Sequence, residues 1–280
     1  MKTIKILGGA AVVILFIVFL SVSGGSEGTR GAAVADSETT AGARTEYSPP
    51  VEPADDRSGK KPSLTVIIDP GHGFGDPGSQ PAFLKVPEKE LTMKTARYLK
   101  EELEKRGADV VLTHDGTSYP DENEIMRLAD SLGIEYEPEK IKAGNNVFSA
   151  YERMIYEQIL EKRYDNCFFI SLHTNSVEDA PEKKGSVIDW CADNPEAAGM
   201  WDLANDLTDR LHTDLGVKLT ISEDSYDMAF IVTKRVEMPA VLLELGYGSN
   251  REDAEKLQSE AFLLDYAKVL AEVIVGTFAK

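Results

Sequence analysis

Four side chains that could bind a metal or move a proton follow short apolar runs of the 280-residue chain. His72 comes directly after "VIIDPG", His173 ends "FFISLH" and Glu244 ends "PAVLLE", while Glu88 lies just after Pro87. Packing alone does not explain apolar runs that end so abruptly in histidine or glutamate. Two imidazoles and one carboxylate form a usual catalytic zinc set with an open position. A second carboxylate can take a proton from water and pass it to a leaving nitrogen.

These residues need a scaffold, and the hydrophobic pattern predicts one. Apolar, β-branched runs alternate with stretches of helical periodicity, which favours a three-layer α/β fold with a mostly parallel twisted sheet flanked by helices. In such folds ligands lie beyond the carboxyl ends of the strands, where these runs end. We expect strands at residues 64–68, 109–113, 166–172, 185–191, 228–232 and 240–243, and helices at residues 87–106, 124–132, 147–163, 203–215 and 261–278.

The glycine-rich loop around His72 does not have the pattern of a phosphate site. It lacks the lysine and the serine or threonine of a P-loop, and its glycine spacing differs from a dinucleotide-binding fingerprint. A structural turn is the simpler alternative to a metal loop at this point.

Four stretches resemble the motif blocks of the type 3 N-acetylmuramoyl-L-alanine amidases, which are zinc-dependent cell-wall hydrolases. They occur in the order of that family and extend over most of residues 65–278. The stretches are "IDPGHGFGDPGS", "PEKELTMKTARYLKEEL", "FISLHTNS" and "MPAVLLELGYGSN". Four blocks in order are far more specific than one.

The resemblance assigns roles to these residues. It implies that His72, Glu88 and His173 bind one Zn²⁺ per domain and that Glu244 is the general base. The bond cut would be the amide between N-acetylmuramic acid and the L-alanine of the stem peptide in peptidoglycan. The loop glycines would then let the backbone turn and place His72.

The sequence departs from the family in two places. His114 stands after the second strand, where relatives usually have an arginine, and residues 115–146 look like an insertion. The insertion could be a lid, a solvated decoration or an inhibitory element removed by an activator protein. We expect Asn175, His114 and Asn250 to be candidate substrate-binding residues.

The N-terminal segments and the overall composition indicate where the protein acts and which ligands it does not bind. Residues 6–22 form an apolar run after Lys2 and Lys5, so residues 1–25 are predicted to be a signal peptide or a membrane anchor. Residues 26–62 are predicted to be a disordered linker and residues 63–280 the catalytic domain. We therefore expect an exported, cell-envelope protein. The net charge of −18 argues against nucleic-acid binding.

Three matters stay open from the sequence. Cys167 and Cys191 could form one disulfide or remain two buried thiols. The enzyme could be a zinc hydrolase of another amide, such as a peptidase or a deacetylase. The fold could also serve as a catalytically silent wall-binding module, although the four candidate residues are all present.

Overall fold

The computed structural model describes residues 63–141, 147–225 and 230–279. The predicted signal or anchor at residues 1–25 and the predicted linker at residues 26–62 lie outside the described residues. Among the helices that are described, none has the length and apolar character needed to cross a membrane.

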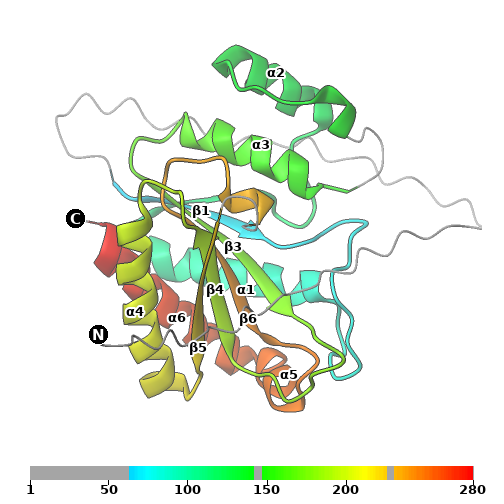
Figure 1. The fold of residues 1–280 in the computed structure, drawn as a ribbon, viewed down its shortest axis with the longest axis vertical. Helices are drawn as coiled ribbons and strands as arrows, with labels where there is room; N and C mark the ends of the chain where they lie inside the picture. The colour runs from blue at the N-terminus through cyan, green and yellow to red at the C-terminus, as the bar shows by residue number, and fades with distance from the viewer. Residues whose placement is uncertain (1–62, 142–146, 226–229, 280) are drawn as a thin grey trace, which may run out of the picture. The chain divides into compact units, whose positions relative to one another are not determined.

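The centre of the domain is a mostly parallel sheet, as predicted (Figure 1). The strand order is β2-β1-β3-β6-β4-β5. Strands β2, β1, β3 and β6 run parallel, β4 is antiparallel to β6, and β5 is parallel to β4. The strands span Thr65–Pro70 (β1), Asp109–Leu112 (β2), Cys167–Asn175 (β3), Ser186–Cys191 (β4), Leu219–Asp224 (β5) and Ala240–Tyr247 (β6).

Helices cover both faces of the sheet and complete the three layers (Figure 1). One face packs against α1, α4 and α6, and the other against α3 and the 3₁₀ turn η2. The helices span Glu88–Glu104 (α1), Glu122–Leu132 (α2), Ala150–Glu161 (α3), Ala197–Leu215 (α4), Arg251–Leu257 (α5) and Glu260–Phe278 (α6), and the 3₁₀ turns span Pro138–Lys140 (η1) and Ile231–Thr233 (η2).

The side-chain alternation of the strands explains how the sheet separates its two cores. Successive residues of a strand point to opposite faces. In β3, Phe168 and Ile170 belong to the core under α1 and α6, whereas Phe169 belongs to the core under α3. By the same alternation Ser171 and His173 lie on the α3 face.

Residues 115–146 contain α2, which packs against α3 outside the three layers (Figure 1). Asp121 caps the helix by accepting from the Glu124 amide, and Gly133 ends it with a left-handed φ of 68°. Ile125 and Leu128 are buried in the α3-side core. Helix α2 is therefore packed on α3, whereas residues 135–141 are mostly exposed.

Two parts of the predicted secondary structure are wrong. The strand predicted at residues 228–232 is absent where it can be checked: residues 226–229 lie outside the described residues, and Ile231–Thr233 is a 3₁₀ turn. The sixth strand is β5, whose alternating sequence LTISED carries a period-2 signal that the prediction overlooked.

The question of a disulfide is also answered by the structure. Cys167 and Cys191 are both free thiols.

Candidate metal centre

The structure brings His72, Glu88 and His173 together at the carboxyl ends of β1 and β3. The three residues offer one ligand atom each, and these atoms lie within 4.8 Å of one another. His72 Nε2 is 3.3 Å from Glu88 Oε2, and His173 Nδ1 is 3.2 Å from Glu88 Oε1. The two imidazole rings stand edge to face with centroids 4.9 Å apart. A histidine–glutamate–histidine set of this kind suits a catalytic zinc with an open position.

Backbone groups orient the glutamate of this cluster. Glu88 is buried in the first turn of α1, where Pro87 precedes the helix in an extended conformation. Its Oε1 accepts from the Thr174 amide at 2.8 Å and its Oε2 from the Ser79 amide at 2.8 Å. Each oxygen therefore keeps a lone pair for a cation or an imidazole.

The loop after β1 adopts a conformation that crowds the site. His72 has a φ of 65° and Phe74 a φ of 53°, which non-glycine residues adopt only where the surroundings hold them. A Cβ at Gly71 would lie 2.5 Å from His173 Cε1, and a Cβ at Gly78 would lie 2.6 Å from His72 Cδ2. The two glycines leave the space that the imidazoles occupy, so the loop after β1 packs tightly around the two candidate metal-binding histidines.

Asp76 orients His72 from behind, a role that the sequence prediction missed. Its Oδ2 lies 2.8 Å from His72 Nδ1, which leaves Nε2 directed at Glu88. Burial opposes a charge on His72, but the bonds with Asp76 and Glu88 raise the pKa of His72 to about 10. Burial likewise opposes the Glu88 carboxylate, but the bonds from His173 and His72 hold its pKa well below the ordinary value. Both shifts have the same meaning: the Glu88 carboxylate stabilises a positive charge placed beside it.

Glu244 lies next to this cluster on β6. It pairs in register with His173 of β3, and its Oε2 is buried without a hydrogen-bond partner. Burial, followed by the nearby Glu88 carboxylate, raises the pKa of Glu244 well above its ordinary value. An unpartnered carboxylate with a high proton affinity is what a general base requires.

Arg153 of α3 holds the backbone of the loop after β1 through several hydrogen bonds. Its Nη1 donates to Pro70 O at 2.9 Å and to the Asp69 carboxylate, and its Nη2 donates to His72 O. Asp69 also accepts from Thr113 Oγ1 and Ser171 Oγ, at 2.6 and 2.8 Å. The sequence prediction missed Arg153, because nothing in the sequence of α3, which also carries three glutamates, distinguishes it from a solvated charge.

His114 lies behind the metal loop and is not a metal ligand. It is 2% exposed, and its Nε2 lies 2.8 Å from Pro70 O. Because a carbonyl only accepts, Nε2 carries the proton, and the unpartnered Nδ1 is the acceptor of a neutral ring. Burial, together with Arg153, lowers the pKa of His114 to about 4.

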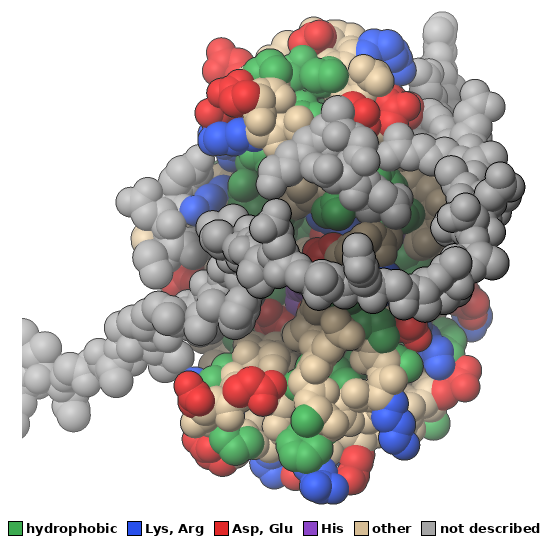
Figure 2. Space-filling model, turned by 90° about the vertical axis from the view of Figure 1, so that its right-hand side faces the viewer, with side chains coloured by type: hydrophobic (Ala, Val, Ile, Leu, Met, Phe, Trp, Pro, Cys, Tyr) green, Lys and Arg blue, Asp and Glu red, His purple; other side chains and the backbone are tan. Residues whose placement is uncertain are grey.

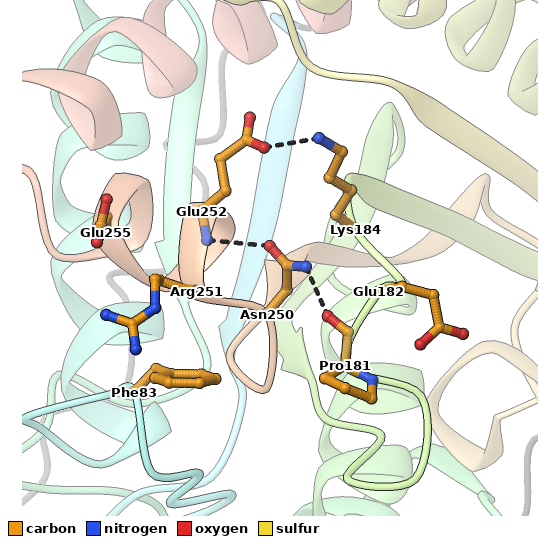
Figure 3. Close-up of a pocket in the computed structure, with 8 residues that line it drawn as sticks. All are labelled: Phe83, Pro181, Glu182, Lys184, Asn250, Arg251, Glu252 and Glu255. Atoms are coloured by element: carbon orange, nitrogen blue, oxygen red, sulfur yellow. Dashed lines mark hydrogen bonds and ion pairs between the residues drawn. The ribbon is translucent and has the colours of Figure 1, made fainter.

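The two asparagines differ in how they are used. Asn175 ends β3, where its carbonyl accepts from the Gly248 amide at 2.8 Å. Asn250 caps α5 by accepting from the amides of Glu252 and Asp253, and its Nδ2 donates to Pro181 O. Figure 3 shows that this cap stands between the two sides of a surface pocket of about 470 Å³. The contacts give Asn250 a structural role, and a substrate role for either residue stays a prediction.

The metal cluster is accessible from one side of the domain. His72 and His173 are part-exposed, with side-chain exposures of 24% and 22%. Figure 2 shows a histidine surface in a recess between the two bulging parts of that face. The accessible cluster thus lies beyond the carboxyl ends of the strands, where α/β folds place their ligand sites.

Comparison with known proteins identifies the family. The chain matches the N-acetylmuramoyl-L-alanine amidase family over residues 66–275, and it belongs to that family. It is 30% identical over 208 residues to the probable cell wall amidase LytH of Staphylococcus saprophyticus. That match covers 73% of this chain and 55% of the relative, so the chain spans about half of the length of that relative.

Solved structures show the same fold. The N-acetylmuramoyl-L-alanine amidase AmiC2 of Nostoc punctiforme matches with a TM-score of 0.55 and 25% identity, covering 76% of this chain and 96% of that one. The CwlD amidase of Clostridioides difficile, solved in complex with the GerS lipoprotein, matches with a TM-score of 0.57 and 20% identity, covering 76% and 97%.

Proposed function

We propose that this chain is a zinc-dependent hydrolase of the amide bond between N-acetylmuramic acid and the L-alanine of the stem peptide in peptidoglycan. The observation that carries the proposal is the cluster of His72, Glu88 and His173 beside the unpartnered Oε2 of Glu244. The donor set fits zinc, because two imidazole nitrogens and one carboxylate oxygen converge while glycines leave the space around them.

The residues divide the chemistry between them. Zinc, when bound, supplies a Lewis acid that polarises the amide carbonyl and makes water more acidic. His72, Glu88 and His173 would hold it, and Asp76 fixes the orientation of His72. Glu244 takes the proton of the attacking water at Oε2 and returns it to the amide nitrogen as the C–N bond breaks. The freed amine is the amino end of the L-alanine residue.

The setting follows from the same proposal. The substrate is a cell-wall polymer and a relative is named a cell wall amidase, so we propose that the chain acts in the cell envelope. Residues 1–25 would export it and, if retained, anchor it at residues 6–22. The structure of CwlD in complex with the GerS lipoprotein supports a partner protein for this chain as well.

The proposal is tested with the purified full-length protein and purified peptidoglycan. Bound zinc is measured by elemental analysis, and soluble products are identified by mass spectrometry before and after chelation and after zinc is returned. We expect free stem peptides with an L-alanine amino end, lost on chelation and restored by zinc. Cleavage elsewhere in the stem would identify a peptidase, and release of acetate a deacetylase. Zinc-free protein that binds the wall without turnover would overturn the enzyme assignment.

A further inference from the structure

One buried side chain of α3 bonds the end of β1 and the loop that follows it. Arg153 Nη1 donates to the Asp69 carboxylate and, at 2.9 Å, to Pro70 O. Its Nη2 donates to His72 O, and its Nε donates to Phe148 O at 3.0 Å. All three nitrogens of the guanidinium are therefore engaged, and the residue is 5% exposed.

The bond to His72 O acts where the backbone is in an unfavourable conformation. His72 has a φ of 65°, which a residue with a side chain adopts only where its surroundings hold it. Asp76 bonds the imidazole at Nδ1, at 2.8 Å, but this contact does not hold the backbone that carries the ring. A charge-assisted bond from Arg153 is stronger than a neutral one and fixes the peptide that follows His72.

The loop after β1 is held from two helices. On the α1 side, Thr92 Oγ1 donates to Gly71 O at 2.8 Å. Lys89 Nζ, also of α1, donates to Phe74 O at 2.6 Å. The His72 carbonyl between them accepts from the guanidinium of α3 instead. Helix α1 therefore fixes the loop on either side of the candidate ligand, and α3 fixes the ligand residue itself.

Aromatic packing sets the position of the guanidinium. Arg153 Cζ lies 4.8 Å from the centre of the Phe148 ring, two residues before α3 begins. The Phe148 ring stacks on Tyr119 at 5.3 Å, and Tyr119 packs on Phe74 of the loop at 4.3 Å. The planar guanidinium is therefore ordered before it bonds the loop, so little freedom is lost in making those bonds.

We propose that Arg153 is a positioning residue of the metal site: through its bond to His72 O it holds the loop in the conformation that turns His72 toward Glu88. The inference rests on the proposed function, and it assigns part of the metal affinity to α3. The competing explanation is that Arg153 only balances the buried charge of Asp69. The two roles require different parts of the guanidinium, so substitutions can separate them.

The test compares Arg153→Lys with Asp69→Asn in the full-length protein. A lysine keeps the positive charge beside Asp69, but its donors leave a single atom and do not span Asp69 and His72 O as two Nη atoms do. Asp69→Asn has the reverse effect, because it removes the charged partner and leaves the donors to the loop carbonyls. A neutral residue at position 153 is avoided, since it would leave a buried carboxylate unpaired. Urea unfolding gives the stability of each variant.

The first measurement is zinc affinity, by competition with a chromophoric chelator under conditions where each variant is folded. We expect Arg153→Lys to weaken zinc binding about 10- to 100-fold, the effect of losing a group that orients a metal-binding histidine. Asp69→Asn should stay within about twofold of the wild type, because His72 O keeps its donor. Equal losses in the two variants would assign the effect to the ion pair and overturn the positioning role.

The second measurement follows the loop in zinc-free protein. The amides of Gly73 and Asp76 each donate to the other residue's carbonyl at 2.9 Å, so their hydrogen exchange reports opening of the loop. Arg153→Lys should speed exchange in residues 71–78 about tenfold or more, because a hydrogen bond from a charged group is lost. Asp69→Asn should leave this exchange unchanged. Wild-type exchange in Arg153→Lys would overturn the inference.

Hydrogen exchange requires neither zinc nor substrate, so it distinguishes this inference from the proposed function. If the wild-type protein binds no zinc and releases no stem peptides, but loop exchange depends on Arg153, the positioning role stands and the proposed function fails. If the wild type releases stem peptides and both variants exchange as it does, the proposed function stands and the positioning role fails.

Discussion

The two faces of the central sheet both bury apolar residues, but they differ near the carboxyl ends of the strands. The face under α1 and α6 is apolar along its strands, as at Ile68, Ile170 and Leu243. The face under α3 places polar side chains at the equivalent positions one residue later, as at Asp69, Ser171 and Glu244. Hydrophobic burial on the first face supplies stability. The second face buries an apolar core of its own, with Ile67, Phe169 and Leu242, and also carries the polar side chains of the candidate site.

The two faces differ most clearly at Leu243 and Glu244, one apolar and one charged. They are neighbours on β6 and point to opposite faces. Both are buried, with exposures of 0% and 6%. Substitutions at the two positions should therefore separate activity from stability, and the following predictions run from the largest expected effect to the smallest.

Glu244→Gln should reduce kcat by about 10²- to 10⁴-fold, because a general base of this kind contributes about that factor. The amide keeps the shape of the side chain but cannot accept a proton from water. Bound zinc, measured by elemental analysis, should be unchanged, and chemical unfolding should show no loss of stability. Wild-type kcat in this variant would remove Glu244 from the reaction.

Leu243→Ala should show the reverse pattern. Removing a fully buried leucine costs about 2–5 kcal/mol of unfolding free energy, because it loses burial and leaves a cavity. Urea unfolding measures this loss, and kcat per folded molecule should stay within about twofold of the wild type if the two faces act independently. A large fall in kcat would show that the faces are coupled.

Asp76→Ala should lower zinc affinity about 10- to 100-fold, as expected for a residue that orients a metal-binding histidine. Competition with a chromophoric chelator measures the dissociation constant. Asp179→Ala, an exposed aspartate in the loop after β3, is the matched control and should leave zinc affinity unchanged. Equal affinities for the two variants would show that the loop holds His72 without Asp76.

Glu157→Gln tests how a buried carboxyl group on the α3 side makes the free energy of unfolding depend on pH. Both oxygens of Glu157 are buried without partners, and burial, then Asp69 and Glu161, raises its pKa well above the ordinary value. The folded state therefore keeps a proton that the unfolded state releases above about pH 4.5, and stability falls as pH rises from that point.

Glu157 should contribute about 1.4 kcal/mol per pH unit to this fall while its folded form stays protonated. The variant should lose that share and keep the share of Glu244, whose pKa burial also raises. Urea unfolding of both proteins at pH 5 and pH 8 measures the difference. Glu139→Gln, at an exposed position of η1, should keep the wild-type pH dependence. A wild-type slope in Glu157→Gln would assign the pH dependence to another group.

The sequence by itself determined the layers and the meeting of His72, Glu88 and His173 at one edge of the sheet. The apolar runs before His173 and Glu244 predicted buried strands, and parallel strands bring their carboxyl ends to one edge. Local pattern was sufficient here because burial and periodicity are properties of each segment. The same reasoning placed Glu88 in the first turn of its helix, on the side of the sheet where the strands end.

Only the tertiary structure decided the contacts between segments distant in the chain. Arg153 reaches Asp69 and His72 O from α3, and no local pattern records that approach. Burial beside Arg153 lowers the pKa of His114 to about 4, and that burial depends on how α3 packs on the loop after β1. Desolvation and convergence depend on packing in three dimensions, so these features follow from the fold and not from the spacing of residues.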